Sequence, residues 1–223
     1  MTPRSITANL VRMTARTDAA DSSFCHGLIV VPRRELSLDF VNTVAWRGST
    51  QEESLHTVAD LLKWFVSAGI IVGPGAPGLQ KFFEAKPTLG AAIFTDAIAI
   101  RETLYRLLRS LAVGSSPGAR DLDHFNAVLS EAPSRTLLDQ VKASLGWRIE
   151  VNATAASLLT PVLWSAADIL VGAPSVRLRQ CANERCLWLF LDDSKNGSRR
   201  WCSMQSCGNR AKAHRHYLRQ KRQ

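Results

Sequence analysis

Four of the five cysteines lie near the end of the chain and form two closely spaced pairs. Cys181 and Cys186 make the first pair and Cys202 and Cys207 the second, with four residues inside each pair and fifteen between the pairs. Four soft thiolates on two short loops are the ligand set of tetrahedral Zn²⁺ in closed structural sites. Two disulfides, or an unpaired redox or packing role, are the alternatives, but the chain shows no secretory signal and cytosolic thiols stay reduced. We therefore predict one structural zinc ion per chain.

A zinc ion with four cysteine ligands leaves no coordination position open for a water molecule, so this site is not expected to be catalytic. The rest of the chain contains no Ser/His/Asp spacing, phosphate-binding loop or paired-carboxylate motif. His26, His56 and His124 are isolated and are better explained as surface or packing residues. We therefore expect a protein that is not an enzyme.

The residues around the cysteines predict a hairpin and a helix. Apolar Leu187–Leu191 favours a strand and is followed by turn-forming Asp, Asn and Gly residues, so we expect a hairpin with Arg199–Cys202. Ser203 is a suitable N-cap for a final helix. One face of that helix is expected to carry Met204, Cys207, Ala211 and Leu218. One cysteine pair on a hairpin knuckle and the other at a helix start is the arrangement of a treble-clef finger.

Two stretches of the chain carry a resemblance to known families. Residues 199–212, RRWCSMQSCGNRAK, resemble the CGNR zinc finger, named for the residues that stand here as Cys207, Gly208, Asn209 and Arg210. Residues 36–48, LSLDFVNTVAWRG, followed by ADLLKWFVSAGI, are similar to the start of the ABATE domain. That domain precedes the finger in a bacterial family described as stress-induced transcription regulators. The resemblance implies a transcription regulator whose partner is DNA.

The formal net charge of +9 is concentrated in the finger. Residues 175–223 contain twelve Lys and Arg side chains against three acidic ones, whereas residues 1–174 contain sixteen of each. Four thiolates and one Zn²⁺ together add two negative charges, which leaves the finger near +7. A small module with this charge favours a polyanionic partner, nucleic acid first. The alternative function is a protein-interaction module in which the finger binds an acidic protein surface.

The candidates for nucleic-acid contact share a positive charge or a titratable ring and a place in the finger: Arg199, Arg200, Arg210, Lys212, Arg215, His216 and Arg219. The last four fall on one flank of the final helix, at about 100° per residue. The alternatives are a flank that is merely solvated and, for Arg185, Arg199 and Arg200, a role in offsetting the thiolate charge. Trp188 and Trp201 either stack on bases or, as is common beside small metal sites, form a miniature core.

Residues 28–174 are expected to form a mainly helical domain with a small antiparallel β unit. Apolar periodicity predicts a helix over residues 55–69, begun by a capping box at Ser49 or Thr50, and a long helix from Thr88 to Gly114. Alternation over residues 147–151 predicts a strand that pairs with residues 137–141. This domain, with its balanced charge, is expected to fold without the finger at residues 175–223.

Residues 1–27 are polar and lack periodicity, which predicts a flexible extension, and Met13 is a second candidate start. No apolar run approaches the roughly 18 residues of a membrane span, so we expect a cytoplasmic, nucleoid-associated protein.

Four polar residues in apolar stretches of the first domain are candidates for a ligand pocket: Asp39, Asn42, Arg47 and Arg101. The first three match the ABATE motif. A helix cap or a buried ion pair explains such residues equally well. A small-molecule effector and a homodimer are therefore expectations that the sequence leaves open.

Overall fold

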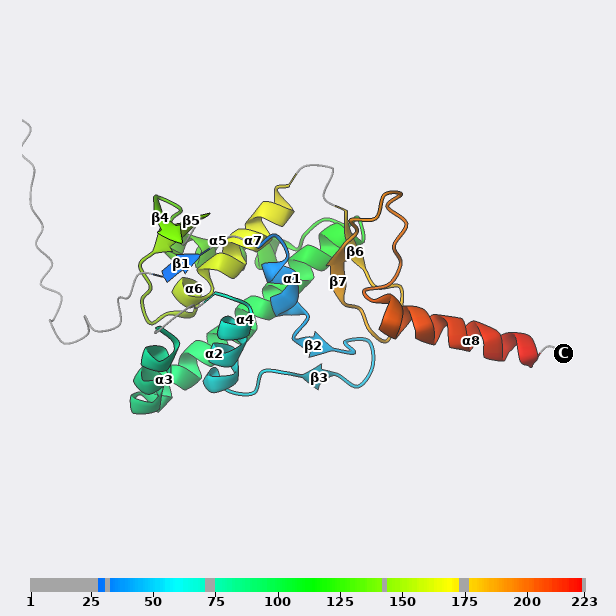
Figure 1. The fold of residues 1–223 in the computed structure, drawn as a ribbon, viewed down its shortest axis with the longest axis horizontal. Coiled ribbons are helices and arrows are strands. Elements are labelled where there is room, and N and C mark those ends of the chain that lie inside the picture. Colours follow the sequence, from blue (N-terminus) through cyan, green and yellow to red (C-terminus); the bar gives the residue numbers. More distant parts are fainter. Residues whose placement is uncertain (1–27, 31–32, 71–74, 142–143, 173–176, 222–223) are drawn as a thin grey trace, which may run out of the picture.

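The computed structural model in Figure 1 describes residues 28–30, 33–70, 75–141, 144–172 and 177–221. A small sheet lies at one end of a helical body, and the last helix projects from the other end. The extension predicted at residues 1–27 lies outside the described residues. None of the helices in the described ranges combines the length and apolarity that crossing a membrane requires.

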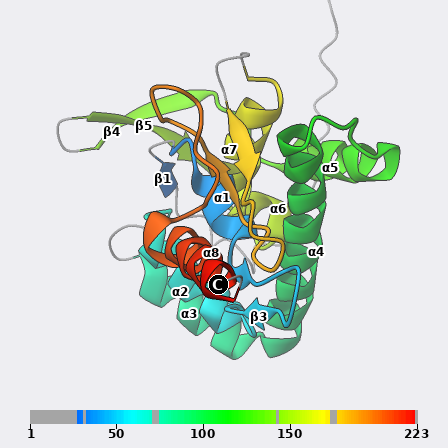
Figure 2. The same cartoon turned by 90° about the vertical axis from the view of Figure 1, so that its right-hand side faces the viewer.

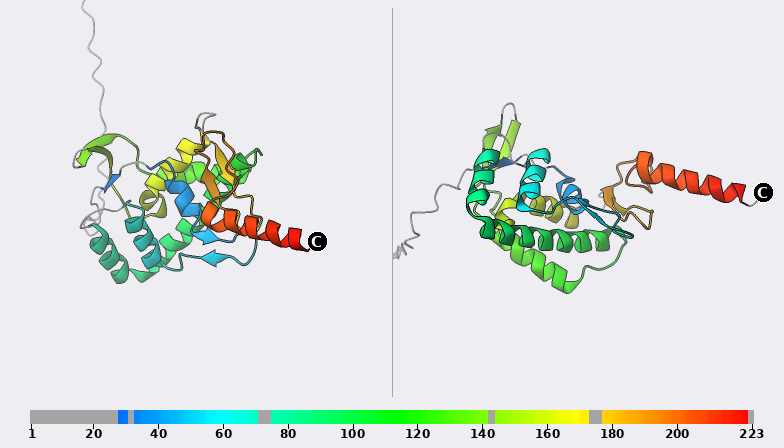
Figure 3. Two further views of the ribbon diagram at one scale, coloured as in Figure 1. Left: turned by 45° about the vertical axis from the view of Figure 1, so that its right-hand side comes forward. Right: turned by 90° about the horizontal axis from the view of Figure 1, so that it is seen from below.

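One long helix, α4 (Pro87–Ala112), runs through the helical body, as Figure 3 shows, and confirms the long helix predicted from Thr88. Its apolar residues recur every three or four positions, and Ile93, Ala97, Leu104 and Leu108 are buried. The helices that pack against α4 are α1 (Leu36–Val41), α2 (Val58–Ser67), α3 (Gly75–Ala85), α5 (Ala119–Glu131), α6 (Ala155–Leu158) and α7 (Thr160–Leu170).

The strands described by the structure form small antiparallel sheets. In the first, β5 (Ser144–Ile149) lies between β1 (Leu28–Val30) and β4 (Leu137–Val141). The predicted pairing of β4 with β5 is confirmed, with Leu138 opposite Trp147. A second sheet pairs β2 (Val44–Ala45) with β3 (Glu52–Glu53), and a third pairs β6 (Leu178–Gln180) with β7 (Leu189–Leu191).

The predicted start of α2 is wrong. The N-cap is Thr57, whose hydroxyl accepts the backbone N–H of Asp60 while the Asp60 carboxylate accepts the N–H of Thr57. The same Ser/Thr-x-x-acid spacing occurs at Ser49 and Thr50, but those two residues lie in the β2–β3 connection. Only Thr57 immediately precedes the apolar stripe, and that position decides which of the three motifs caps the helix.

The predicted hairpin partner in the finger is also wrong. Strand β7 pairs with β6, whereas Arg199–Cys202 forms no strand. The buried carboxylate of Asp192 accepts the backbone N–H groups of Ser194 and Arg199, both at 3.1 Å. Side-chain hydrogen bonds therefore turn the chain back, where the sequence indicated a strand ladder.

The finger shares the hydrophobic core of the helical body. Leu178 of β6 and Leu189 and Leu191 of β7 are buried in the same apolar cluster as the residues of α1, α4 and α7. Strand β6 contacts α4, and β7 contacts both α1 and α4. The β6–β7 hairpin is therefore a structural element of both regions.

Candidate metal centre and nucleic-acid interface

The four predicted zinc ligands meet at one point. Cys181 and Cys186 lie in the loop between β6 and β7, Cys202 follows the returning segment, and Cys207 lies in the π-helical turn η1 (Met204–Gly208). All four Sγ atoms lie within 4.8 Å of one another. The Sγ atom of Cys202 is 3.7 Å from that of Cys186 and 3.8 Å from that of Cys207.

These separations fit a tetrahedral metal site. A Zn–S bond of about 2.3 Å sets the edge of a ZnS₄ tetrahedron at about 3.8 Å. A disulfide needs an S–S distance of about 2.05 Å, and all four thiols are free. Cys181, Cys186 and Cys207 are buried and Cys202 is half-buried. The donor set therefore suits a closed structural zinc site.

The thiols also influence one another's ionisation. Hydrogen bonds from Cys186 and Cys202 lower the pKa of Cys181 to about 2. The same contact with Cys181 raises the pKa of Cys186 to about 12, and contacts with Cys181 and Cys186 raise the pKa of Cys202. A thiolate at Cys181 thus opposes the ionisation of Cys186 and Cys202, and a bound cation would offset this accumulation of negative charge.

Local hydrogen bonds shape the two ligand loops. The backbone carbonyl of Asn183 accepts the backbone N–H of Cys186 at 2.8 Å. The side-chain oxygen of Asn183 accepts the backbone N–H of Arg185 at 3.1 Å. The Asn183 amide nitrogen lies 3.5 Å from Cys207 Sγ and so links the first loop to the second. Ser203 caps η1 as predicted, because its hydroxyl accepts the N–H of Ser206.

Aromatic side chains form a small core around the thiols. Trp188 and Trp201 pack against the buried cluster of Phe190 and three of the cysteines, which supports the core interpretation of these two tryptophans. Trp46, from the β2–β3 connection of the first domain, packs there too. A contact across more than a hundred residues leaves no local signal in the sequence, so Trp46 was not predicted at this site.

Two side chains attach the finger hairpin to the first domain. Asn42 pairs with the backbone of Leu189: its Nδ2 donates to the carbonyl at 2.8 Å, and its Oδ1 accepts the N–H at 3.1 Å. The indole N–H of Trp188 donates to the carbonyl of Val44 at 2.9 Å. Asn42 therefore acts as a strand-edge partner for β7, a role that its place in an apolar stretch did not disclose.

The cysteine loop itself docks on the first domain. The hydroxyl of Tyr105 on α4 donates to the carbonyl of Leu187 at 3.0 Å, and the N–H of Gly48 donates to the carbonyl of Arg185 at 3.2 Å. Trp46 and Leu187 have positive φ angles of 55° and 59°. Such angles cost a non-glycine residue about 1 to 3 kcal/mol, and packing between the two regions holds both residues in place.

Arg47 and Arg101, predicted for a ligand pocket, form buried ion pairs. Arg47 donates to both carboxylate oxygens of Glu102, at 2.7 and 3.0 Å. Arg101 donates to Glu53 at 2.6 and 2.7 Å and to Glu102 at 2.9 Å. The two arginine side chains are only 7% and 3% exposed. The ion-pair alternative therefore describes both residues.

Asp39 of α1 is paired with Arg33, which precedes the helix, and burial raises the pKa of Asp39 even though that arginine lowers it. Asp39, Asn42, Arg47 and Arg101 thus have protein partners, and none of them lines the cavities described below. A ligand role for these four residues stays a prediction.

Two of the predicted nucleic-acid contacts, Arg199 and Arg200, are exposed but have partners within the finger. The guanidinium of Arg199 donates to the carbonyls of Trp201, at 3.0 Å, and Cys202, and lies 4.5 Å from the centre of the Phe190 ring. The guanidinium of Arg200 lies 5.4 Å from the centre of the Trp201 ring. Arg199 therefore braces the second cysteine loop, and nucleic-acid contact by either residue stays a prediction.

The other candidates lie on α8 (Asn209–Gln220), which continues from η1 and projects from the body. Arg210 stacks on Trp46, with its guanidinium carbon 4.2 Å from the ring centre. Lys212 and Arg219 are exposed. Leu218 is 43% exposed and Met204 52%, whereas Cys207 is buried, so the apolar face predicted for this helix is buried only around Cys207. The side chains of two candidates lie outside the described part of the structure: Arg215 and His216.

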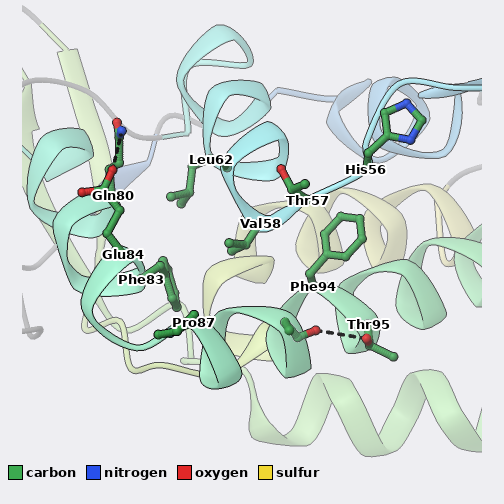
Figure 4. A pocket seen from close by; sticks show the side chains of 12 residues that line it. His56, Thr57, Val58, Leu62, Gln80, Phe83, Glu84, Pro87, Phe94 and Thr95 are labelled. Atoms are coloured by element: carbon green, nitrogen blue, oxygen red, sulfur yellow. Dashed lines mark hydrogen bonds between the residues drawn. The ribbon is translucent and has the colours of Figure 1, made fainter.

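A cavity of about 430 Å³ opens between α2, α3 and α4 of the first domain. Figure 4 shows Val58, Leu62, Phe83 and Phe94 around it, with polar groups such as Thr57 at its edge. A mostly apolar lining with a few polar groups, in this range of volume, is typical of small-molecule sites. No sequence motif indicated this cavity, since its walls come from three separate helices.

Comparison with known families identifies two regions. The ABATE model, described as "Putative stress-induced transcription regulator", matches residues 34–173. The CGNR zinc finger model matches residues 177–220 and includes all four cysteines of the metal centre. No curated protein matches the chain.

Proposed function

Since the chain belongs to the ABATE family and ends in a CGNR zinc finger, we propose that it is a transcription regulator that binds DNA through this finger. One zinc ion per chain, held by four thiolates, would have a structural role, because no coordination position remains for substrate or water. Such a regulator would be cytoplasmic and associated with the nucleoid.

The observation that carries the proposal is the free-standing basic helix α8. It is seen nearly end on in Figure 2 and stands clear of the other helices in Figures 1 and 3. Its twelve residues span about 18 Å and include no acidic side chain. The major groove of B-DNA, about 12 Å wide, admits an α-helix, and the exposed Lys212 and Arg219 would contact phosphates along it.

A double substitution tests this proposal. Lys212→Ala with Arg219→Ala removes two cations from α8, and we expect the slope of log K against log salt for duplex DNA to become shallower by about 1.8. Lys81→Ala with Arg120→Ala removes the same charge from exposed positions on α3 and α5 and should leave the slope unchanged. Equal slopes in both double variants would reject α8 as the DNA-binding element.

The same titration addresses the alternative of an acidic protein partner. Tyr217 and Leu218 on α8 are 51% and 43% exposed and could contact a protein surface. Poly-glutamate of matched charge should bind far more weakly than duplex DNA if the groove geometry matters. Equal affinity for the two polyanions, with no preference for the duplex, would favour the protein-interaction function.

We further propose that the first domain senses a small apolar molecule in the cavity of Figure 4, a role favoured by the apolar lining. The dye 1-anilinonaphthalene-8-sulfonate is a suitable probe. It should bind the wild type saturably, and Ala91→Trp should abolish this binding by filling the cavity. Ala92→Trp is the control, since Ala92 is an exposed neighbour outside the lining. Identical dye binding by both variants would contradict a ligand site here.

A further inference from the structure

A second cavity, also of about 430 Å³, lies at the root of α8. Its walls come from the first cysteine loop, the first turns of α8 and the β2–β3 connection, which contributes Trp46. Trp46 and Trp201 supply indole surfaces, and Cys207 connects the wall to the metal centre. The cavity therefore depends on both the finger and the first domain.

Three basic side chains with N–H groups line this cavity: Arg185, Arg210 and His214. Arg210 and His214 are one helical turn apart on α8, so their side chains lie on the same face. Among the described residues, no carboxylate lies within ion-pairing distance of any of the three, although Glu184 also belongs to the lining. Their hydrogen-bonding capacity is thus available to a ligand.

Arg210 is oriented by its contact with the Trp46 ring, at 4.2 Å. A guanidinium stacked on an indole keeps its N–H groups at the edge, where they can form paired hydrogen bonds with an oxyanion. The loop that carries Arg185 is fixed by the hydrogen bond from Gly48 to the Arg185 carbonyl. An oriented guanidinium beside two further basic side chains suits a compact anion with several oxygen atoms.

We propose that the cavity at the root of α8 binds a phosphate group through Arg185, Arg210 and His214. The phosphate comes from the backbone of DNA, in which case the site rests on the proposed function and anchors one end of α8, or from a free phosphorylated molecule. The competing explanation is that these cations only offset the negative charge of four thiolates around zinc.

The test combines Arg185→Ala with His214→Ala, which leaves the Trp46 contact of Arg210 and all four cysteines in place. Binding of inorganic phosphate to the zinc-loaded full chain is followed by ³¹P NMR, and affinity for a duplex is measured at fixed salt. We expect phosphate binding to weaken at least tenfold, as the loss of hydrogen bonds to a charged group implies. Arg120→Ala with Lys81→Ala is again the control, here for a general loss of positive charge away from the cavity.

The outcomes separate the two sources and the two proposals. A parallel tenfold loss of duplex affinity supports a backbone phosphate, whereas unchanged duplex affinity with lost phosphate binding supports a free phosphorylated ligand. Unaltered phosphate binding in the double variant overturns the site. A double variant that loses zinc but still binds phosphate overturns it too, because these side chains would then only offset the thiolate charge. If the wild type binds phosphate but no duplex, the DNA-binding function fails while the phosphate site stands.

Discussion

At the scale of single residues, the most consequential side chains are the buried charges of the first domain. Arg47 and Arg101 are nearly inaccessible to solvent, and each pairs with a carboxylate on a neighbouring element, although Arg47 Nε has no hydrogen-bond partner among the described residues. Removing one partner of such a pair costs more than the pair contributes, because the other charge stays buried without compensation. Glu102 contacts both arginines and is the residue at which this network is most sensitive.

The network predicts a dependence of stability on acid. Burial alone raises the pKa values of Glu53 and Glu102, but hydrogen bonds and charge from Arg101 and Arg47 outweigh it and lower both. The folded state therefore binds these protons less tightly than the unfolded chain. Stability from the pairs is complete above the ordinary glutamate pKa of 4.5 and declines as the pH falls through the lowered values.

We expect Glu102→Gln to lower the free energy of unfolding at pH 7 by about 3 kcal/mol, toward the lower end for broken buried pairs because Glu102 is 32% exposed. The variant should also lose part of the acid dependence below pH 4.5. Thermal unfolding followed by circular dichroism between pH 3 and 7 measures both effects. Asp123→Asn, an exposed change on α5, should follow the wild-type curve. If the stability of Glu102→Gln fell with pH as steeply as that of the wild type, the role of this carboxylate in the acid dependence would be contradicted.

At the scale of elements, the sequence predicted the features that depend on residues close together in the chain. The spacing of the cysteines indicated four thiols that meet at one point, apolar periodicity indicated α4, and Ser203 marked the cap of η1, from which the last helix continues. The β6–β7 pairing was missed, because β6 is only three residues long and is selected by burial of Leu178 against the first domain. Partners of Asn42 and Arg47 were missed for the same reason: they lie far away in sequence.

The contact between the cysteine loop and the β2–β3 connection leaves no space for a side chain at Gly48. A Cβ atom there would lie 1.8 Å from the carbonyl oxygen of Glu184. Gly48→Ala should therefore push the loop away and break the hydrogen bond to Arg185, at a cost of about 1 to 3 kcal/mol. Hydrogen exchange of residues 181–188 should accelerate in this variant.

Gly78→Ala is the matched control, because a Cβ atom at Gly78 meets nothing within 4 Å. Hydrogen exchange of residues 181–188 in Gly78→Ala should equal that in the wild type. Unchanged protection of residues 181–188 in Gly48→Ala would mean that the loop does not need the β2–β3 connection for its order.

At the scale of the whole molecule, two regions that match separate family models share one core. Residues 28–174 were expected to fold alone because their charge is balanced and their helices are amphipathic. That expectation overlooked the three leucines by which the β6–β7 hairpin enters the core, each worth about 1.5 to 3 kcal/mol when fully buried. Independent folding stays a prediction, and the shared core argues against it.

Metal removal should therefore destabilise the first domain as well as the finger. Without zinc the cysteine loops lose their common anchor, and if half of the leucine burial is lost with them, the free energy of unfolding falls by about 3 kcal/mol. For a chain of this length, that corresponds to a Tm lower by about 10 °C. Calorimetry of the full chain before and after chelation, with Cys202→Ser as the genetic equivalent, measures the shift.

One cooperative transition at the lower temperature is expected, because the elements that bury Leu178, Leu189 and Leu191 also hold α1 to α4. Two transitions, with the larger at its original temperature, would instead show that the finger melts alone and that the first domain needs neither the metal nor the hairpin.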